Sequence, residues 1–145
     1  MLAKTLIAGA LVGATVAVHA IGLVVLLKVF MKPVTSPPTG FWPVTWLLVR
    51  VTWCLIFIHL IEILVWGMFF YRQNCLPDAE SAFYFAGVTY TTVGYGDLVL
   101  PKAWRMLGPI EGLTGILMCG LSTGFFFAVV NKTYASLLDK SRNKS

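Results

Sequence analysis

Residues 79–97, AESAFYFAGVTYTTVGYGD, decide how this chain folds. The run 79–90 is apolar and aromatic, and it is too short to cross a bilayer, for which about 20 residues are needed. Asp78 is a suitable N-cap for a helix that begins at residue 79, and Glu80 lies in the first turn, where the helix dipole favours a negative charge. The stretch therefore predicts a re-entrant helix that enters a membrane and ends inside it.

The residues that follow, TTVGYGD at 91–97, suit an ion-coordinating backbone. A dehydrated cation needs a ring of oxygens, and backbone carbonyls supply them without a fixed charge. Carbonyls that succeed one another along a line require unusual φ and ψ angles, which explains glycine at 94 and 96. The hydroxyl of Thr92 adds a ligand at the inner end. The preceding helix points its C-terminal end inward, where its dipole favours a cation.

The composition places the whole chain in a membrane. Its 145 residues are 58% hydrophobic and 12% charged, whereas soluble domains are about 45–50% apolar and about 25% charged. These numbers exclude a soluble enzyme, and they exclude a disordered protein, which requires low hydrophobicity. Cys54, Cys75 and Cys119 show neither a CxxC pair nor metal-ligand spacing, so they define no disulfide scaffold and no zinc site.

Three further segments are long and apolar enough to span a bilayer, namely 5–27, 51–71 and 107–130. The first can also be read as a signal peptide cleaved after Val18-His19-Ala20, but its apolar run continues to Phe30, which favours a retained helix. Prolines interrupt the chain before the second span. We therefore divide the chain into a first helix with a proline-rich linker, a central domain and a short basic tail, residues 1–40, 41–131 and 132–145.

The basic residues indicate the orientation. Three, or four with Lys4, lie on the side of segment 72–105, whereas seven lie on the other side: Lys28, Lys32, Arg50, Lys132, Lys140, Arg142 and Lys144. The positive-inside rule therefore predicts an external N-terminus and a cytoplasmic C-terminus. Because these charges flank apolar segments, we expect contact with membrane lipids and not with nucleic acid. No span carries arginine at every third position, so the sequence shows no voltage sensor.

The order of spans around TTVGYGD resembles the pore domain of the small bacterial potassium channels. The resemblance covers residues 51–130 and includes Trp104-Arg105 at the start of the inner helix. It implies an all-α membrane protein with an outer helix, a pore helix at 79–91, a selectivity filter at 92–97 and an inner helix at 105–130. The first span, which lies outside the resemblance, brings the expected number of transmembrane helices to three. The resemblance also implies a homotetramer, because one chain supplies a single filter strand.

The resemblance further implies passive, potassium-selective conduction across the cell (inner) membrane of a bacterium, without enzymatic activity or an organic cofactor. The K⁺ ions would be coordinated by the filter residues Thr92, Val93, Gly94, Tyr95 and Gly96. The alternative is a membrane subunit of a potassium transport complex. Such transporters normally carry several degenerate filter loops in a longer chain, whereas this chain has one intact filter.

Several residues are candidates to support the filter, among them Thr91. Tyr84 stands where relatives often carry a tryptophan that holds the aspartate after the filter, so we predict a Tyr84–Asp97 hydrogen bond. Val88 stands where some relatives place a glutamate behind the filter.

The second and third spans each carry one acid, Glu62 and Glu111, and both are expected at similar depth below the outer surface. We predict that they form a buried pair behind the filter, which His59, one turn from Glu62, can join. The alternative is that each acid bonds a local backbone or filter group.

Gly115 and Gly120 on the inner helix are candidates for a gating hinge or, equally, for close helix packing. Phe125 is a candidate to line the cavity, although its run 125–127 is also suited to lipid contact. The first helix falls outside the resemblance, so we expect a peripheral addition to the pore that lacks polar groups.

Overall fold

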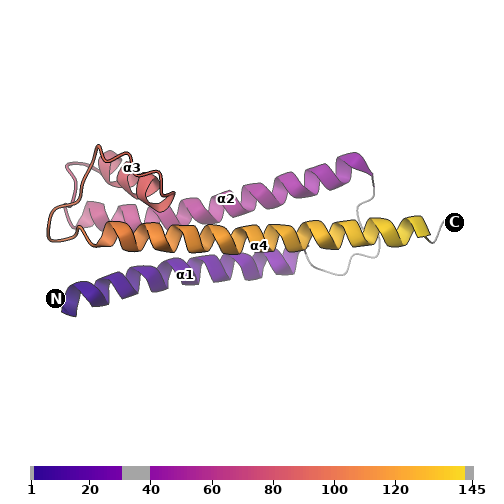
Figure 1. Ribbon diagram of the computed structural model, residues 1–145, viewed down its shortest axis with the longest axis horizontal. Helices are drawn as coiled ribbons and strands as arrows, with labels where there is room; N and C mark the ends of the chain where they lie inside the picture. Colours follow the sequence, from indigo (N-terminus) through magenta and orange to yellow (C-terminus); the bar gives the residue numbers. More distant parts are fainter. Residues whose placement is uncertain (1, 31–39, 143–145) are drawn as a thin grey trace.

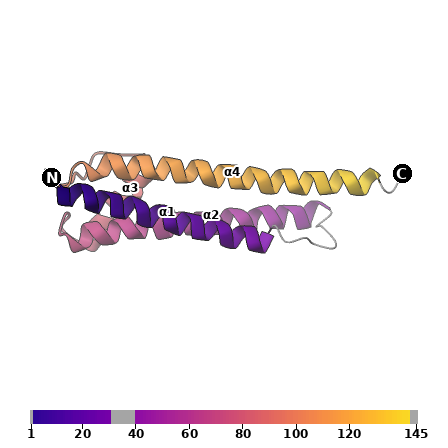
Figure 2. The ribbon, with the colours of Figure 1, turned by 90° about the horizontal axis from the view of Figure 1, so that it is seen from below.

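The computed structural model describes residues 2–30 and 40–142, and in these parts the regular secondary structure is all α-helix, joined by loops and turns. Three long helices lie side by side, and the short α3 packs near one end of the bundle (Figures 1 and 2). The helices are α1 (Leu2–Phe30), α2 (Phe41–Arg72), α3 (Ala79–Tyr90) and α4 (Leu107–Arg142). The three long helices are long and apolar enough to cross a membrane, which confirms the three spans predicted from the sequence.

The short helix α3 begins as the sequence predicts. Asp78 is its N-cap and accepts a hydrogen bond from the backbone N–H of Ser81 at 2.7 Å. This bond satisfies one of the N–H groups that lack a partner in the first turn of any helix. The N-terminus of the chain and α3 lie at one end of the bundle, and the C-terminus lies at the other (Figure 1).

The helix bounds differ from the expected ones. α2 begins at Phe41, ten residues before the predicted span, because Pro43 falls in its first turn, where a missing N–H costs no hydrogen bond. α4 begins at Leu107 and continues to Arg142, so most of the predicted tail is helical. No proline or glycine follows Gly124 to stop it. The proline-rich linker before Gly40 lies outside the described residues.

α4 buries one face along its length. Its buried residues recur at every third or fourth position, as one helical stripe requires: Leu107, Glu111, Thr114, Met118, Ser122, Phe125, Val129 and Thr133. The opposite face, with Leu113, Leu117 and Leu121, is exposed in the single chain. The assignment of Phe125 to a cavity or to lipid is therefore wrong: it packs inside the chain against a cluster that includes Leu26 and Leu55.

The first helix is an integral part of the bundle and carries buried polar groups, so the expectation of a peripheral helix without them is wrong. Ala8 and Leu11 of α1 belong to the same hydrophobic cluster as Trp66 and Phe70. Thr15 and His19 of α1 are also buried. Uniform apolarity concealed these contacts, because a helix that is apolar all round shows no preferred face.

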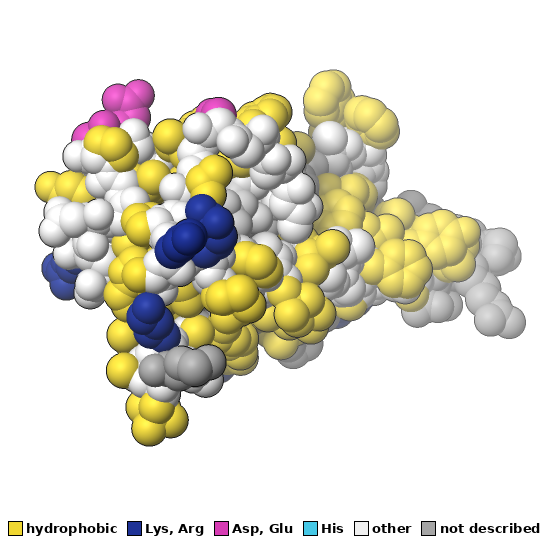
Figure 3. Space-filling view, turned by 60° about the vertical axis from the view of Figure 1, so that its left-hand side comes forward, with side chains coloured by type: hydrophobic (Ala, Val, Ile, Leu, Met, Phe, Trp, Pro, Cys, Tyr) yellow, Lys and Arg dark blue, Asp and Glu magenta, His cyan; other side chains and the backbone are white. Residues whose placement is uncertain are grey.

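The charged and the hydrophobic side chains on the surface are distributed as in a membrane protein. In the face drawn in Figure 3, lysine, arginine and acidic side chains gather at the end that carries α3, and hydrophobic side chains cover the flanks behind it. The exposed hydrophobic residues include Trp42, Trp46 and Trp53 on α2. Tryptophan is enriched where helices pass through the membrane interface.

Candidate functional site

The TTVGYGD loop (residues 91–97) has an alternating backbone. Thr92, Gly94 and Gly96 have positive φ angles of 62°, 54° and 77°, whereas the intervening Val93 and Tyr95 do not. Alternation between left-handed and right-handed conformations turns successive carbonyl groups toward the same side of the chain, as a row of cation ligands requires. The two glycines were predicted to need this freedom; the positive φ of Thr92 was not foreseen.

The end of α3 holds the start of this loop. The backbone N–H of Thr91 donates to the carbonyl of Gly87 at 3.1 Å, and its hydroxyl donates to the same oxygen at 2.7 Å. The N–H of Gly94 donates to the carbonyl of Val88 at 3.2 Å. These carbonyls lack partners in the last turn of a helix, so the loop satisfies them and is positioned by them.

A further hydrogen bond fixes the far end of the loop. The Tyr84 hydroxyl on α3 donates to the Asp97 carboxylate at 2.8 Å, which is the bond predicted from the sequence. The hydrogen bond to this carboxylate raises the pKa of Tyr84, so the phenol stays protonated as a donor. The loop is thus tied to α3 at both ends, while every one of its residues is exposed in the single chain.

Gly115 allows α4 to approach the end of α3. A Cβ atom at this position would meet the backbone carbonyl of Tyr90, the last residue of α3. A Cβ atom at Gly112 would also come within 3.4 Å of the Thr89 carbonyl oxygen. At Gly120, by contrast, a Cβ atom would have no neighbour within 4 Å. Gly115 therefore has a packing role, and a hinge at either glycine stays a prediction.

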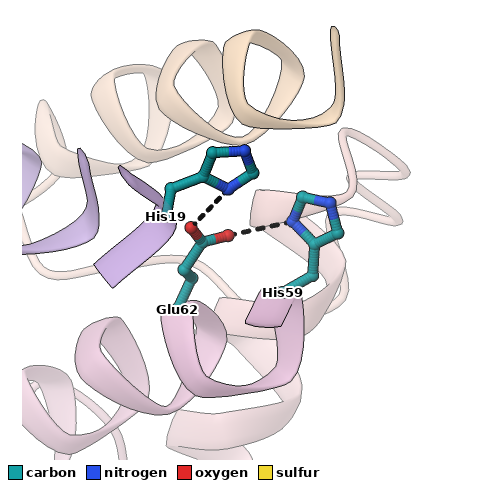
Figure 4. A group of neighbouring side chains, drawn as sticks. All are labelled: His19, His59 and Glu62. Carbon is teal, nitrogen blue, oxygen red and sulfur yellow. Dashed lines mark hydrogen bonds and ion pairs between the residues drawn. The ribbon is translucent and has the colours of Figure 1, made fainter. Parts of the chain in front are cut away.

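A polar cluster lies inside the bundle, where His19 of α1 meets His59 and Glu62 of α2 (Figure 4). The Glu62 carboxylate on α2 faces two imidazoles, with Nδ1 of His19 at 2.9 Å and Nδ1 of His59 at 2.9 Å. The Tyr90 hydroxyl also donates to Glu62. Ser122 of α4 lies 2.9 Å from Nε2 of His59. Because each of the four helices supplies a member, this cluster ties the bundle together at the C-terminal end of α3.

The predicted pair of Glu62 and Glu111 is wrong as a hydrogen-bonded contact, although both acids are fully buried. Neither carboxylate oxygen of Glu111 has a hydrogen-bond partner among the described residues. Equal depth on two helices does not fix which way each side chain points, and Glu62 is already bonded to Tyr90 and the histidines. The part of the prediction that joined His59 to Glu62 is confirmed.

Sequence reasoning missed His19 and Tyr90. A signal for His19 was present, because an ionisable residue inside an apolar span is costly and normally pairs with another polar group. His19 is the one such residue between positions 5 and 27. Tyr90 gave no comparable signal, since an aromatic residue at the end of an apolar run is ordinary.

Comparison with known proteins adds one finding. A family model described as an ion channel matches residues 58–132, just over half of the chain. The match runs from the middle of α2 through α3 and the TTVGYGD loop into α4. None of the curated proteins and none of the solved structures matches the chain.

Proposed function

The chain belongs to the ion channel family, and we propose that it is a potassium-selective channel that conducts K⁺ passively through a homotetrameric pore. Family membership makes it a channel and not an enzyme, and its three apolar helices make it a multi-pass membrane protein. The potassium selectivity, the tetramer, the bacterial inner membrane and the external N-terminus are parts of the proposal.

The backbone of the TTVGYGD loop carries the potassium assignment. Positive φ at positions 92, 94 and 96 lets the intervening residues and the glycines turn their carbonyls toward one side. The loop follows a half-length helix, α3, that ends next to it, so the negative end of the helix dipole faces the approaching cation. Rings of such carbonyls replace the hydration shell of K⁺ in potassium channels.

The exposure of the loop supports the tetramer. All seven residues of 91–97 are exposed in the single chain, although irregular backbone at membrane depth persists only where protein or a water-filled path surrounds it. Four chains around an axis would enclose the ion and cover the loop, and closed cyclic symmetry is a common arrangement of homo-oligomers. The exposed face of α4 is apolar and available for such contacts or for lipid.

Flux through the purified protein tests the proposal. We expect liposomes that contain the full chain and a potassium gradient to show K⁺ flux that Ba²⁺ blocks, and no Na⁺ flux. Gly94→Ala should abolish the selectivity or the flux, because Gly94 has a φ of +54° that a Cβ atom opposes. Gly9→Ala is the matched control, since a Cβ atom there meets nothing within 4 Å, and its flux should equal that of the wild type.

The outcomes separate the candidate functions. Stable tetramers without flux would contradict the channel and favour a subunit of a potassium transport complex. Equal K⁺ and Na⁺ flux would retain an ion channel but refute potassium selectivity. Unchanged selectivity in Gly94→Ala would refute the role given to the loop.

A further inference from the structure

The chain contains two histidines, and the fold brings both to one carboxylate. His19 lies on α1, and His59 and Glu62 lie on α2, yet their candidate ligand atoms all lie within 4.8 Å of one another. Both imidazoles face the carboxylate through Nδ1, one toward each oxygen (Figure 4). We propose that His19, His59 and Glu62 form a binding site for a transition-metal dication of the zinc class.

The donor atoms select this class of metal. Two imidazole nitrogens and one carboxylate oxygen suit Zn²⁺ and its neighbours, whereas Ca²⁺ and Mg²⁺ prefer a shell of oxygens alone. Ligand atoms about 2.0–2.2 Å from a tetrahedral Zn²⁺ lie roughly 3.3 Å from one another. Each Nδ1 is 2.9 Å from its carboxylate oxygen. Small side-chain rotations therefore suffice to turn the hydrogen-bonded arrangement into a metal-bound one.

The surroundings of His59 suit a metal ligand, whereas Nε2 of His19 has no hydrogen-bond partner among the described residues. A histidine that ligates a metal nearly always holds its other ring nitrogen in a hydrogen bond, which fixes the tautomer. Nε2 of His59 has this partner in the Ser122 hydroxyl, at 2.9 Å. With the proton on Nε2, Nδ1 is free to bind the metal. The Tyr90 hydroxyl oxygen lies 3.0 Å from the same Nδ1 and is placed to supply a fourth ligand atom to the metal.

Electrostatics favour a cation at this position. Glu62 is 0% exposed and His19 is 1% exposed, and a carboxylate in the apolar interior of a membrane protein is costly unless it is paired. Tyr90 ends α3, so the site also lies at the negative end of that helix dipole. His59 retains 18% of its side-chain exposure, so the cluster is not fully enclosed within the single chain.

Metal binding can be measured whether or not the chain conducts, so this proposal and the proposed function fail separately. The full chain is purified without a polyhistidine tag, stripped with EDTA and titrated with Co²⁺ and with Zn²⁺. We expect one metal per chain by elemental analysis and, for Co²⁺, visible absorption bands of a low-coordinate nitrogen and oxygen site. Thiolate charge-transfer bands would instead place the metal at a cysteine and overturn the proposal.

Variants assign the ligands. His19→Gln and Glu62→Gln should each weaken Co²⁺ binding by at least about tenfold, and Ser122→Ala should do so by about 10–100-fold through the loss of its hydrogen bond. Thr114→Val is the control, because Thr114 is buried on α4, its hydroxyl donates to the Ile110 carbonyl of the same helix and it supplies no ligand; its affinity should equal that of the wild type. Equal binding by all variants would overturn the proposal.

Folding of each variant is checked by its thermal unfolding and its elution volume. If His19→Gln fails to fold, the Co²⁺ titration of the wild-type protein tests the proposal by itself. Absence of saturable Co²⁺ binding, or binding with thiolate charge-transfer bands, then refutes the site.

Discussion

Alanine at Gly115 and alanine at Gly120 should change the stability of the bundle in opposite directions. Both positions lie inside α4, and both were candidates for a hinge. A methyl group at Gly115 would lie 2.9 Å from the carbonyl carbon and 3.1 Å from Cγ of Tyr90, and closer still to its carbonyl oxygen. A methyl group at Gly120 would have no neighbour within 4 Å.

The magnitudes follow from these contacts. Ordinary van der Waals contact begins at 3.4 Å, so Gly115→Ala forces α4 away from the carbonyl oxygen of Tyr90 by roughly 1 Å or more. Overpacking of this kind costs about 2–3 kcal/mol when the obstacle is backbone that cannot rotate away. Alanine is favoured over glycine in a helix by about 0.5–1 kcal/mol, which leaves a net loss of about 1–2.5 kcal/mol. Gly120→Ala gains the helix preference alone, about 0.5–1 kcal/mol.

Unfolding of both variants in mixed detergent micelles, followed by tryptophan fluorescence, measures the two free energies of unfolding. A Gly115→Ala variant as stable as the wild type would refute the close approach of α4 to Tyr90. Equal destabilisation of both variants would refute the open space at Gly120. Potassium flux separates a hinge from packing, because a hinge at Gly120 predicts reduced flux in a variant whose stability is not reduced.

Two further variants test the bonds around the loop and around α1. Tyr84→Phe removes the hydrogen bond to Asp97 and should lower the temperature at which the oligomer dissociates on a gel in the presence of K⁺; no change would show that this bond does not hold the loop. Thr15→Val leaves the indole N–H of Trp66 without its acceptor and should lower the free energy of unfolding by about 1–3 kcal/mol. An unchanged midpoint of unfolding would argue against the contact between Thr15 on α1 and Trp66 on α2.

The local elements of this fold were predictable because each is fixed by residues close together in sequence. The N-cap at Asp78, the half-length helix 79–90 and the glycines at 94 and 96 follow from local backbone chemistry. The three spans follow from hydropathy and length. Even the hydrogen bond between Tyr84 and Asp97 joins residues within one short segment, and it came from the resemblance.

The contacts between distant helices were predicted less well. Depth along a helix can be counted from the sequence, but rotation about its axis cannot when the helix is apolar on every face. That is why Glu62 and Glu111 were paired wrongly, and why Phe125 was assigned to a cavity. The partners of Glu62 come from α1 and α3 as well as α2, and no spacing rule connects residues 19, 62 and 90.

Two polar contacts on α1 give that helix a defined register against α2. Thr15 accepts a hydrogen bond from Trp66 of α2. His19 lies four residues after Thr15 on α1 and is hydrogen-bonded to Glu62, which lies four residues before Trp66 on α2. In a pair of antiparallel helices, residue numbers rise along one helix as they fall along the other, as they do here. An apolar surface alone would let the helices slide and rotate against each other, whereas the two buried hydrogen bonds fix their relative position, because breaking them would leave buried polar groups unpaired. α1 lies outside the family match at 58–132, yet Glu62 inside that match takes one of its hydrogen-bond partners from α1. Removal of α1 would therefore take His19 away from Glu62 and leave the indole N–H of Trp66 without its acceptor, so in this chain the segment that resembles other ion channels depends on a helix that lies outside the match.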